Sequence, residues 1–296
     1  MVPRASEESQ AIALNIIDGM SHMATLPEVT LNIIEVVEDP TSSASDLHRI
    51  VATDPALSAR VLKVVNSAFY GLPRQIGSIN RAISLLGLNA VKNIAVAASL
   101  GKIFRGGTGC ENFEARALWS HSVATAATAC LIARELDSGS SDEAFLAGLL
   151  HDIGFMIALQ HDRGRLAQAF SLLEFDEEGA PDSELLLKER MIFGVDHQDL
   201  GAVLCEKWKF PRTLVAATAH HHDPTELEGN EASIPWIIHV ADRHAASLAG
   251  GFRMDLPVLD VNPASYDAIG LGPVALQELT ESLQDCIGDI EMSMAA

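Results

Sequence analysis

The residues of this sequence that could do chemistry are histidines and aspartates. The clearest unit is His151-Asp152, which directly follows the apolar residues 148–150 and precedes Ile153-Gly154. A neutral imidazole and an adjacent carboxylate can both ligate one borderline-hard metal ion, and the second carboxylate oxygen can bridge to a neighbouring ion. Because such dipeptides also arise by chance, a metal site would need further ligands from elsewhere in the chain.

Further histidines and one aspartate lie at the ends of predicted helices or inside them. Most have an ordinary explanation when taken alone, since lone histidines are common in cores and on surfaces. Histidines at a helix C-terminus also complement the helix dipole. A carboxylate within an apolar helix is different, because its burial is costly unless it is paired, protonated or metal-bound. The residues concerned are His121, His197, His220, His221, His222 and Asp242.

Helical periodicity dominates the sequence and strand-like alternation is nearly absent, which predicts an all-α fold. Asp54-Pro55 is a strong helix start, with Asp at the N-cap and Pro at the first helical position. Ser45-Asp46 is expected to cap a short helix, and residues 250–272 are expected to be mainly loop. The predicted helices cover about residues 6–22, 27–38, 46–51, 55–66, 79–86, 89–104, 113–136, 142–150, 153–160, 163–175, 182–192, 197–208, 211–221, 231–249 and 273–293.

The composition is that of a globular protein with an acidic surface. Hydrophobic residues make up 48% of the 296 residues, and the net charge of −20 disfavours binding to nucleic acid. There is no basic start followed by an apolar stretch, and no apolar run approaches the ~20 residues that span a membrane. The four cysteines form no C-x-x-C pair. We therefore expect a reduced, cytoplasmic protein without a membrane or nucleic-acid partner.

The most evident break in the chain is the stretch RGGTGCEN, in which three glycines fall within residues 106–109. Glycines in such density favour a loop over a helix. We therefore predict a boundary there. It separates an N-terminal helical subdomain, residues 1–108, from a metal-binding helical bundle, residues 109–296.

The order His, His-Asp, His, His-His, Asp along the chain resembles the HD superfamily of metal-dependent phosphohydrolases. The stretch from Asp196 to Pro211 is most similar to the HD-GYP branch, which hydrolyses cyclic di-GMP. The resemblance implies a divalent transition-metal centre, with two ions that are iron or manganese by preference and zinc or nickel as alternatives. It also implies that Asp152 bridges the ions and is the catalytic residue. The implied ligands are His121, His151, Asp152, His197, His221, His222 and Asp242.

The N-terminal half resembles a more specific family. Asp54-Pro55-Ala56-Leu57, the block from Val61 to Gly71 that contains Asn66-Ser67, and Ala82 to Gly87 are similar to HDOD proteins. The resemblance spans about residues 20–225 and implies a bacterial signalling or regulatory module, of a kind regarded as mainly non-catalytic.

The sequence departs from the catalytic HD pattern at three points. Phe155 replaces the lysine that follows His-Asp-x-Gly in active HD enzymes and helps to hold substrate phosphate. The Gly-Tyr-Pro motif is absent after the histidine pair, where the chain continues with Asp223-Pro224. Ala117 occupies the position four residues before His121 that would be Glu in a site with a third ion.

These features leave three functions open. The first is a signal-transduction module whose metal site is structural or sensory and whose helices dock signalling partners, with a homodimer left open. The second is a phosphohydrolase or phosphodiesterase acting on a nucleotide or cyclic dinucleotide, in which two ions clamp a phosphate and activate water. The third is a helical scaffold in which the same residues form a polar network without metal. The departures from the catalytic pattern favour the first.

Overall fold

The computed structural model describes residues 7–20, 28–38, 41–105, 109–177, 180–229, 232–248, 252–281, 283 and 287–288. Within these residues every regular element is helical, and β-pairing is limited to two isolated bridges, Cys110 to Phe113 and Phe175 to Pro181. The prediction of an all-α fold is confirmed.

The chain forms two compact units. The larger falls within residues 1–25 and 104–279, and the smaller within residues 26–103 and 280–296. Helix α1 (Glu7–Asp18) therefore belongs with the larger unit, although it precedes the smaller one in sequence. The division into domains at residue 108 stays a prediction, and most of the glycine-rich loop that suggested it lies outside the described residues.

The smaller unit consists of four α-helices of 8 to 11 residues, one short 3₁₀ helix and the longer helix α6. Asp54 caps α4 as predicted, since its Oδ1 accepts a hydrogen bond from the Leu57 amide at 2.9 Å. Helix α3 begins earlier than predicted, because a capping box formed by Ser43 and Asp46 replaces a cap at Ser45. The helices are α2 (Glu28–Glu38), α3 (Ala44–Val51), α4 (Pro55–Val65), the short 3₁₀ helix η1 (Ala68–Tyr70), α5 (Ile79–Leu86) and α6 (Leu88–Arg105), whose last residues enter the larger unit.

The Asn66-Ser67 block of the resemblance has a structural role in the smaller unit. The Asn66 side chain donates to the carbonyl oxygens of Leu62 and Ile76 at 2.7 and 2.9 Å, and its Oδ1 accepts from the Ile76 amide at 2.6 Å. One amide group thus ties the end of α4 to the far end of the following loop. An amide has both donors and an acceptor for this, which no carboxylate or hydroxyl can replace.

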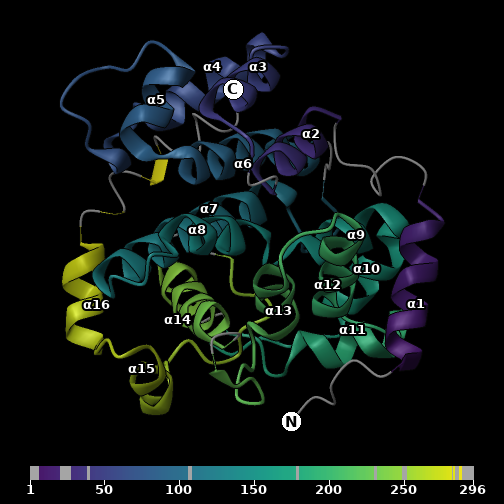
Figure 1. The fold of residues 1–296 in the computed structure, drawn as a ribbon. Helices are drawn as coiled ribbons and strands as arrows, with labels where there is room; N and C mark the ends of the chain where they lie inside the picture. Colours follow the sequence, from purple (N-terminus) through teal and green to yellow (C-terminus); the bar gives the residue numbers. More distant parts are fainter. Residues whose placement is uncertain are drawn as a thin grey trace. The chain divides into compact units, whose positions relative to one another are not determined.

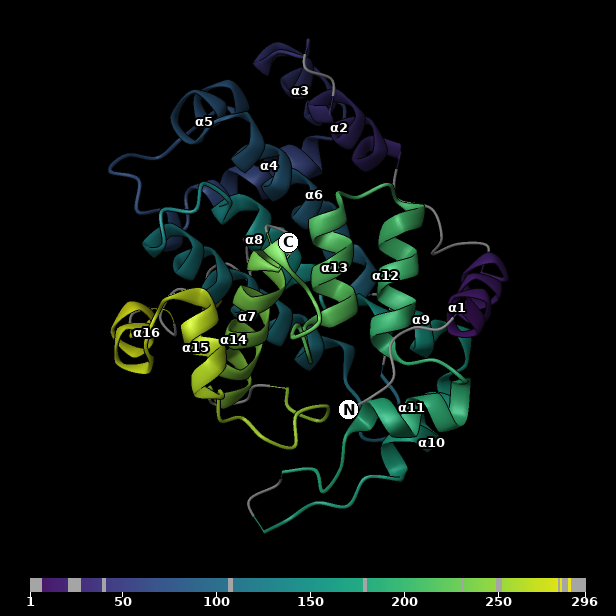
Figure 2. The ribbon, with the colours of Figure 1, turned by 60° about the horizontal axis from the view of Figure 1, so that its bottom comes forward.

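The larger unit is a bundle of long and short helices around an aliphatic and aromatic core (Figure 1). Helices α7 and α8 lie side by side, and α14 packs against both, while α12 packs against α9, α13 and α1. Figure 2 shows α12 and α13 next to each other. The helices besides α1 are α7 (Ala115–Glu135), α8 (Ser141–Leu150), α9 (Ile153–His161), α10 (Arg163–Ser171), α11 (Leu185–Phe193), α12 (His197–Lys207), α13 (Arg212–His220), α14 (Ser233–Ser247), α15 (Pro263–Ile269) and α16 (Pro273–Thr280).

Two glycines bring these helices close together. A Cβ on Gly148 of α8 would lie 2.6 Å from the Cα of Ala126 on α7, closer than real Cβ contacts. A Cβ on Gly154 of α9 would overlap the backbone carbonyl of His197, the first residue of α12. Because glycine has no Cβ, α9 can approach the N-terminus of α12 directly.

Three sequence expectations need correction in this unit. Helix α10 ends at Ser171 rather than at residue 175, and the expected loop 250–272 contains α15. The signal for α15 was present, since Asn262 caps it and Pro263 is its first residue. Helix α16 ends at Thr280, and most of the predicted extension to residue 293 lies outside the described residues.

The most apolar part of the chain is buried. By length and composition the continuous stretch Ser141–His161 would qualify as a membrane span, which the sequence reading did not recognise, yet 89% of its apolar window is inside the protein. A core helix meets the same test, and this stretch is formed by α8 and α9. Cys130 and Cys205 are also buried, whereas Cys110 is half-buried and Cys286 lies outside the described residues.

Candidate metal centre

The structure brings all seven predicted ligands together in the larger unit. His121 lies within α7 and Asp242 within α14, while His151 and Asp152 link α8 to α9. His197 is the first residue of α12, and His221 and His222 directly follow α13. All are buried except His222, whose side chain is 9% exposed. His220 lies outside the cluster and lines a neighbouring groove.

One half of the cluster, the inner group, consists of His121, His151 and Asp242. His121 Nε2 lies 3.0 Å from Asp242 Oδ1, and His151 Nε2 lies 3.6 Å from the same oxygen. The side chains of all three are inaccessible to solvent. The inner group therefore offers two imidazoles and a carboxylate in a closed space.

The other half, the outer group, consists of His197, His221, His222 and Asp255. One ligand atom from each lies within 4.8 Å of those of the others. His197 Nε2 is 3.1 Å from His222 Nε2, which in turn is 3.3 Å from Asp255 Oδ2. The outer group therefore offers three imidazoles and a carboxylate.

Asp152 lies between the two groups and presents one oxygen to each. Its Oδ2 is 3.2 Å from His151 Nε2 and 3.9 Å from His121 Nε2. Its Oδ1 is 3.3 Å from His221 Nε2 and 3.6 Å from His197 Nε2. This is the placement that a carboxylate shared between two cations requires.

Hydrogen bonds behind the cluster orient three of the imidazoles. His151 Nδ1 lies 2.7 Å from the Gly148 carbonyl oxygen, and His221 Nδ1 lies 3.0 Å from that of Thr218. His197 Nδ1 lies 2.7 Å from Glu189 Oε2. Each acceptor holds a ring proton on Nδ1 and so turns Nε2 toward the cluster, as in histidines that ligate metals.

Glu189 is a residue beside the cluster that the sequence did not point to. It lies on α11 and is 1% exposed, and burial raises the pKa of its carboxyl group to about 7 even though His197 opposes the shift. Its Oε2 also accepts from the His197 amide at 3.3 Å. A buried acid on the face of a predicted helix was the available signal, but no spacing rule connects it with His197.

In the described part of the chain, no lysine or arginine forms a close ion pair with the carboxylates of the cluster. Among the described residues, every ion-pair partner within 4.0 Å of Asp152, Asp242 and Asp255 is a histidine. Burial opposes protonation of His151, but the adjacent carboxylates outweigh it and hold its pKa well above the ordinary value. Burial likewise opposes protonation of His197, and Glu189 and Asp152 raise its pKa to about 10. Protons on His151 and His197 thus balance part of the negative charge of the buried carboxylates.

The remaining donors fit a metal ion. Both oxygens of Asp152, both oxygens of Asp255 and one oxygen of Asp242 are buried without a hydrogen-bond partner, as are the Nε2 atoms of His151 and His221. Unsatisfied atoms in such density are rare in folded proteins. All are imidazole or carboxylate atoms that face a shared space, so divalent cations would satisfy their lone pairs and their charge together.

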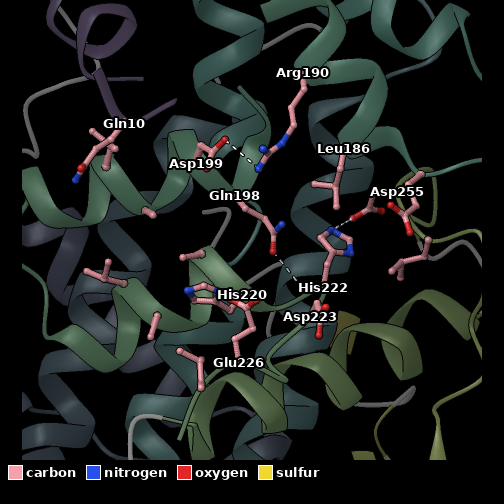
Figure 3. A pocket seen from close by; sticks show the side chains of 18 of the residues that line it. Gln10, Leu186, Arg190, Gln198, Asp199, His220, His222, Asp223, Glu226 and Asp255 are labelled. Carbon is pink, nitrogen blue, oxygen red and sulfur yellow. Dashed lines mark hydrogen bonds and ion pairs between the residues drawn. The ribbon is translucent and has the colours of Figure 1, made fainter. Parts of the chain in front are cut away.

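A groove of about 940 Å³ reaches the outer group and is lined by His222 and Asp255 (Figure 3). Three arginines line the same groove, Arg190, Arg212 and Arg243. Arg190 is engaged by Asp196, at 2.7 Å, and by Asp199, at 3.4 Å. The groove is large enough for a small organic ligand.

Phe155, at the position of the expected lysine, faces the core. Its ring is fully buried and stacks on His197 with 4.1 Å between centroids. It also contacts the rings of Phe113, Phe170 and Phe252. A cation here would lose these contacts and its hydration, so this chain uses the position to support His197 through packing.

Asp255 is the second residue that the sequence reading missed. It lies between α14 and α15, in the segment that was expected to be mainly loop. Its burial is the opposite of what an acid in a surface loop would show. The apolar neighbours Phe252 and Leu256, both buried, were the available signal.

The fold agrees with comparisons to known proteins. The HDOD domain profile matches residues 23–224, and the chain belongs to the HDOD family. A curated relative from Treponema pallidum (strain Nichols), an uncharacterized protein, is 25% identical over 227 residues. That match covers 75% of this chain and 42% of the relative, so this chain spans less than half of the relative's length.

Solved structures show the same fold over almost the whole chain. An HDOD domain protein of unknown function from Geobacter sulfurreducens is 26% identical, with a TM-score of 0.77 and 97% of each chain covered. A protein from Shewanella amazonensis SB2B, named as a candidate phosphohydrolase, is 24% identical with a TM-score of 0.72, covering 97% of this chain and 98% of its own. At this level of identity, the similarity to the Shewanella amazonensis protein shows only that the two chains share a fold.

Proposed function

We propose that this HDOD protein is a bacterial signal-transduction module built around a dinuclear metal centre. The inner group would hold one ion and the outer group the other, with Asp152 bridging them. The observation that carries the proposal is the convergence of buried imidazoles and carboxylates, with Nε2 atoms turned inward and carboxylate oxygens left without partners. A polar network without metal would leave these atoms unsatisfied at considerable cost.

The donor set limits the choice of metal. Mixed imidazole and carboxylate ligation suits iron, manganese, zinc, nickel or cobalt better than calcium or magnesium. The resemblance to HD proteins favours iron or manganese. The pKa of His221 is lowered to about 4 by burial and by His222, so this imidazole is neutral and able to ligate at neutral pH.

A regulatory role is favoured over catalysis by the position of Phe155. Its burial against His197 leaves no lysine to hold a substrate phosphate beside the cluster. The site would then be structural or sensory and would act on signalling partners through the protein surface. We place this activity in the cytoplasm, because the histidine ligands and free thiols need no oxidising compartment.

Phosphohydrolase activity is the second candidate, and the groove favours it. A metal pair of this kind supplies Lewis-acid polarisation of a phosphate and a bound water of lowered pKa. The chain's own residues would admit a phosphorylated molecule along the groove, with Arg212 and Arg243 as cations for its phosphate groups. Asp152 would keep the ligand atoms of the inner and outer groups at a fixed spacing.

Metal analysis of protein purified without a histidine tag tests the proposal. Iron or manganese loaded anaerobically should remain bound after dialysis, and its loss in Asp152→Ala would locate it. Less than about 0.3 ion per chain after loading would instead support a metal-free scaffold, since a site of this donor type binds tightly. Assays of the loaded protein with cyclic di-GMP, other cyclic dinucleotides and an aryl phosphodiester separate the two candidates. Turnover that is absent from Asp152→Ala would establish the enzyme.

A further inference from the structure

Asp255 is an acidic side chain in the cluster that the resemblance to HD proteins does not include. It lies between α14 and α15, beyond the residues that match the HDOD profile. Its side chain is 1% exposed, and neither carboxylate oxygen has a hydrogen-bond partner. A carboxylate in this condition is strongly disfavoured without a cation.

The surroundings of Asp255 suit a metal ion. Its Oδ2 lies 3.3 Å from His222 Nε2, and its ligand atom falls within 4.8 Å of those of His197 and His221. Figure 3 shows the Asp255 carboxylate directed at the His222 ring. Three imidazoles and one carboxylate around a common point form a typical ligand set for a divalent transition metal.

The segment that carries Asp255 also forms part of the groove. Leu256, Pro257 and Val258 line it together with Asp255 itself. Within the segment, a single turn is closed by the Leu256 amide, which donates to the Arg253 carbonyl at 3.0 Å. A cation that binds the Asp255 carboxylate would therefore also restrain residues 256–258, which form one wall of the groove.

Building on the metal centre proposed above, we propose that Asp255 is a ligand of the outer ion and that loading this ion anchors residues 252–258 as one wall of the groove. The occupancy of the outer group would thereby set the shape of the groove. A ligand or partner that binds in the groove would thereby respond to the occupancy of the outer group. A set of metal ligands confined to helices would not provide this coupling.

Manganese(II) binding to the full chain tests this inference. Competition titrations and metal analysis compare the wild type with Asp255→Asn and with a matched control, Asp260→Asn, an exposed acid further along the same segment. Asn keeps the shape of the side chain and removes only a carboxylate without a hydrogen-bond partner, so the variant should fold. We expect it to retain the inner ion and to bind the outer ion at least about tenfold more weakly. The control should match the wild type.

Hydrogen exchange of residues 252–258 supplies a readout that is independent of affinity and activity. Manganese should slow exchange there in the wild type and in Asp260→Asn, and should have little effect in Asp255→Asn. A wild type that binds both ions, combined with unchanged outer-ion affinity in Asp255→Asn or no protection of residues 252–258, would overturn this inference alone. A wild type that binds no manganese, iron or zinc would instead remove the proposed metal centre itself.

Discussion

The inner and outer groups use the same two ligand types but are built and placed differently. The inner group takes His121 and Asp242 from the middle of long helices, and its side chains are closed off from solvent. The outer group takes its ligands from helix ends and a loop, and it reaches the groove through His222 and Asp255. Ligands on helix interiors are fixed by packing, whereas ligands on helix ends and loops can move with what binds beside them.

This difference suggests a division of labour. An ion in the inner group would contact protein atoms alone and would tie α7, α14 and the link between α8 and α9 together. An ion in the outer group would face the groove and could respond to a ligand or a partner. We therefore expect the inner ion to act mainly on stability and the outer ion on regulation.

The largest effect is expected for Asp152, because it belongs to both halves. Asp152→Ala should abolish tight binding of both ions, a loss larger than the ~10–100-fold that supporting residues of metal sites cause. Metal analysis and competition titration measure it, with Asp260→Ala as an exposed control. Retention of one tightly bound ion in Asp152→Ala would show that the carboxylate is not shared.

A substitution in only one group should remove only the ion that is bound there. His121→Gln should remove the inner ion and lower the melting temperature of the loaded protein, since an ion that binds only the folded state stabilises it. His222→Gln should remove the outer ion with a smaller change in melting temperature. Calorimetry with metal analysis on both variants tests this pair, and equal losses of stability would end the proposed division of labour.

The sequence predicted the helical fold, and the candidate ligands that it indicated lie close together, because both leave local signals. Helix periodicity and caps such as Asp54-Pro55 are encoded within a few residues. Ligands such as His151 and His197 lie at helix ends, where their order along the chain resembles that of known HD proteins. The structure adds that these side chains share one buried space, which no local pattern can establish.

The sequence could not predict Glu189 and Asp255, because their roles depend on tertiary contacts. Glu189 meets His197 only because α11 and the start of α12 fold against each other. Asp255 lies in a segment without helical periodicity, and only the folded chain shows that it is buried there together with Phe252 and Leu256. Helix α15 is a different case, since Asn262-Pro263 signalled its start but the surrounding turn formers masked it.

Gly154 allows α9 to approach the start of α12, so the next test is to add a side chain at this position. Gly154→Ala would place a methyl group on the His197 carbonyl and force α9 away from α12. Such overpacking should destabilise the protein by about 1–3 kcal/mol and weaken metal binding by separating Asp152 from the outer group. Gly164→Ala is the control, because it lies in helix α10 with only the Asp162 side chain nearby and should be neutral or slightly stabilising. Denaturant unfolding measures the free energy of unfolding of Gly154→Ala and Gly164→Ala against that of the wild type.

Proton competition should weaken metal binding in both halves, and more steeply in the outer group. In the metal-free protein His151 and His197 have raised pKa values, with that of His197 at about 10, so both carry protons at neutral pH. Those of His221 and His222 are lowered to about 4 and about 3, so these rings add no proton.

Burial and the carboxylates of Asp152 and Asp242 raise the pKa of Asp255, the ligand proposed for the outer ion, to about 7. The inner ion then displaces one proton, and its affinity should rise about tenfold per pH unit between pH 6 and 8. The outer ion also displaces the Asp255 proton below about pH 7, so its affinity should rise more steeply there. Titrations at three pH values measure how metal affinity changes with pH. Affinities independent of pH would show that His151 and His197 carry no proton in the metal-free protein.

The smallest effect is expected for Glu189, which supports only the outer group. Glu189→Gln keeps an oxygen that can accept from His197 Nδ1 but removes the negative charge that makes the imidazole a stronger donor to a metal. Affinity for the outer ion should fall by about tenfold, the lower end of the range for such residues, while the inner ion is unaffected. Glu174→Gln, an exposed acid before α11, serves as control. Equal weakening of both ions in Glu189→Gln would mean that the two halves are coupled through Asp152 more strongly than their separate construction suggests.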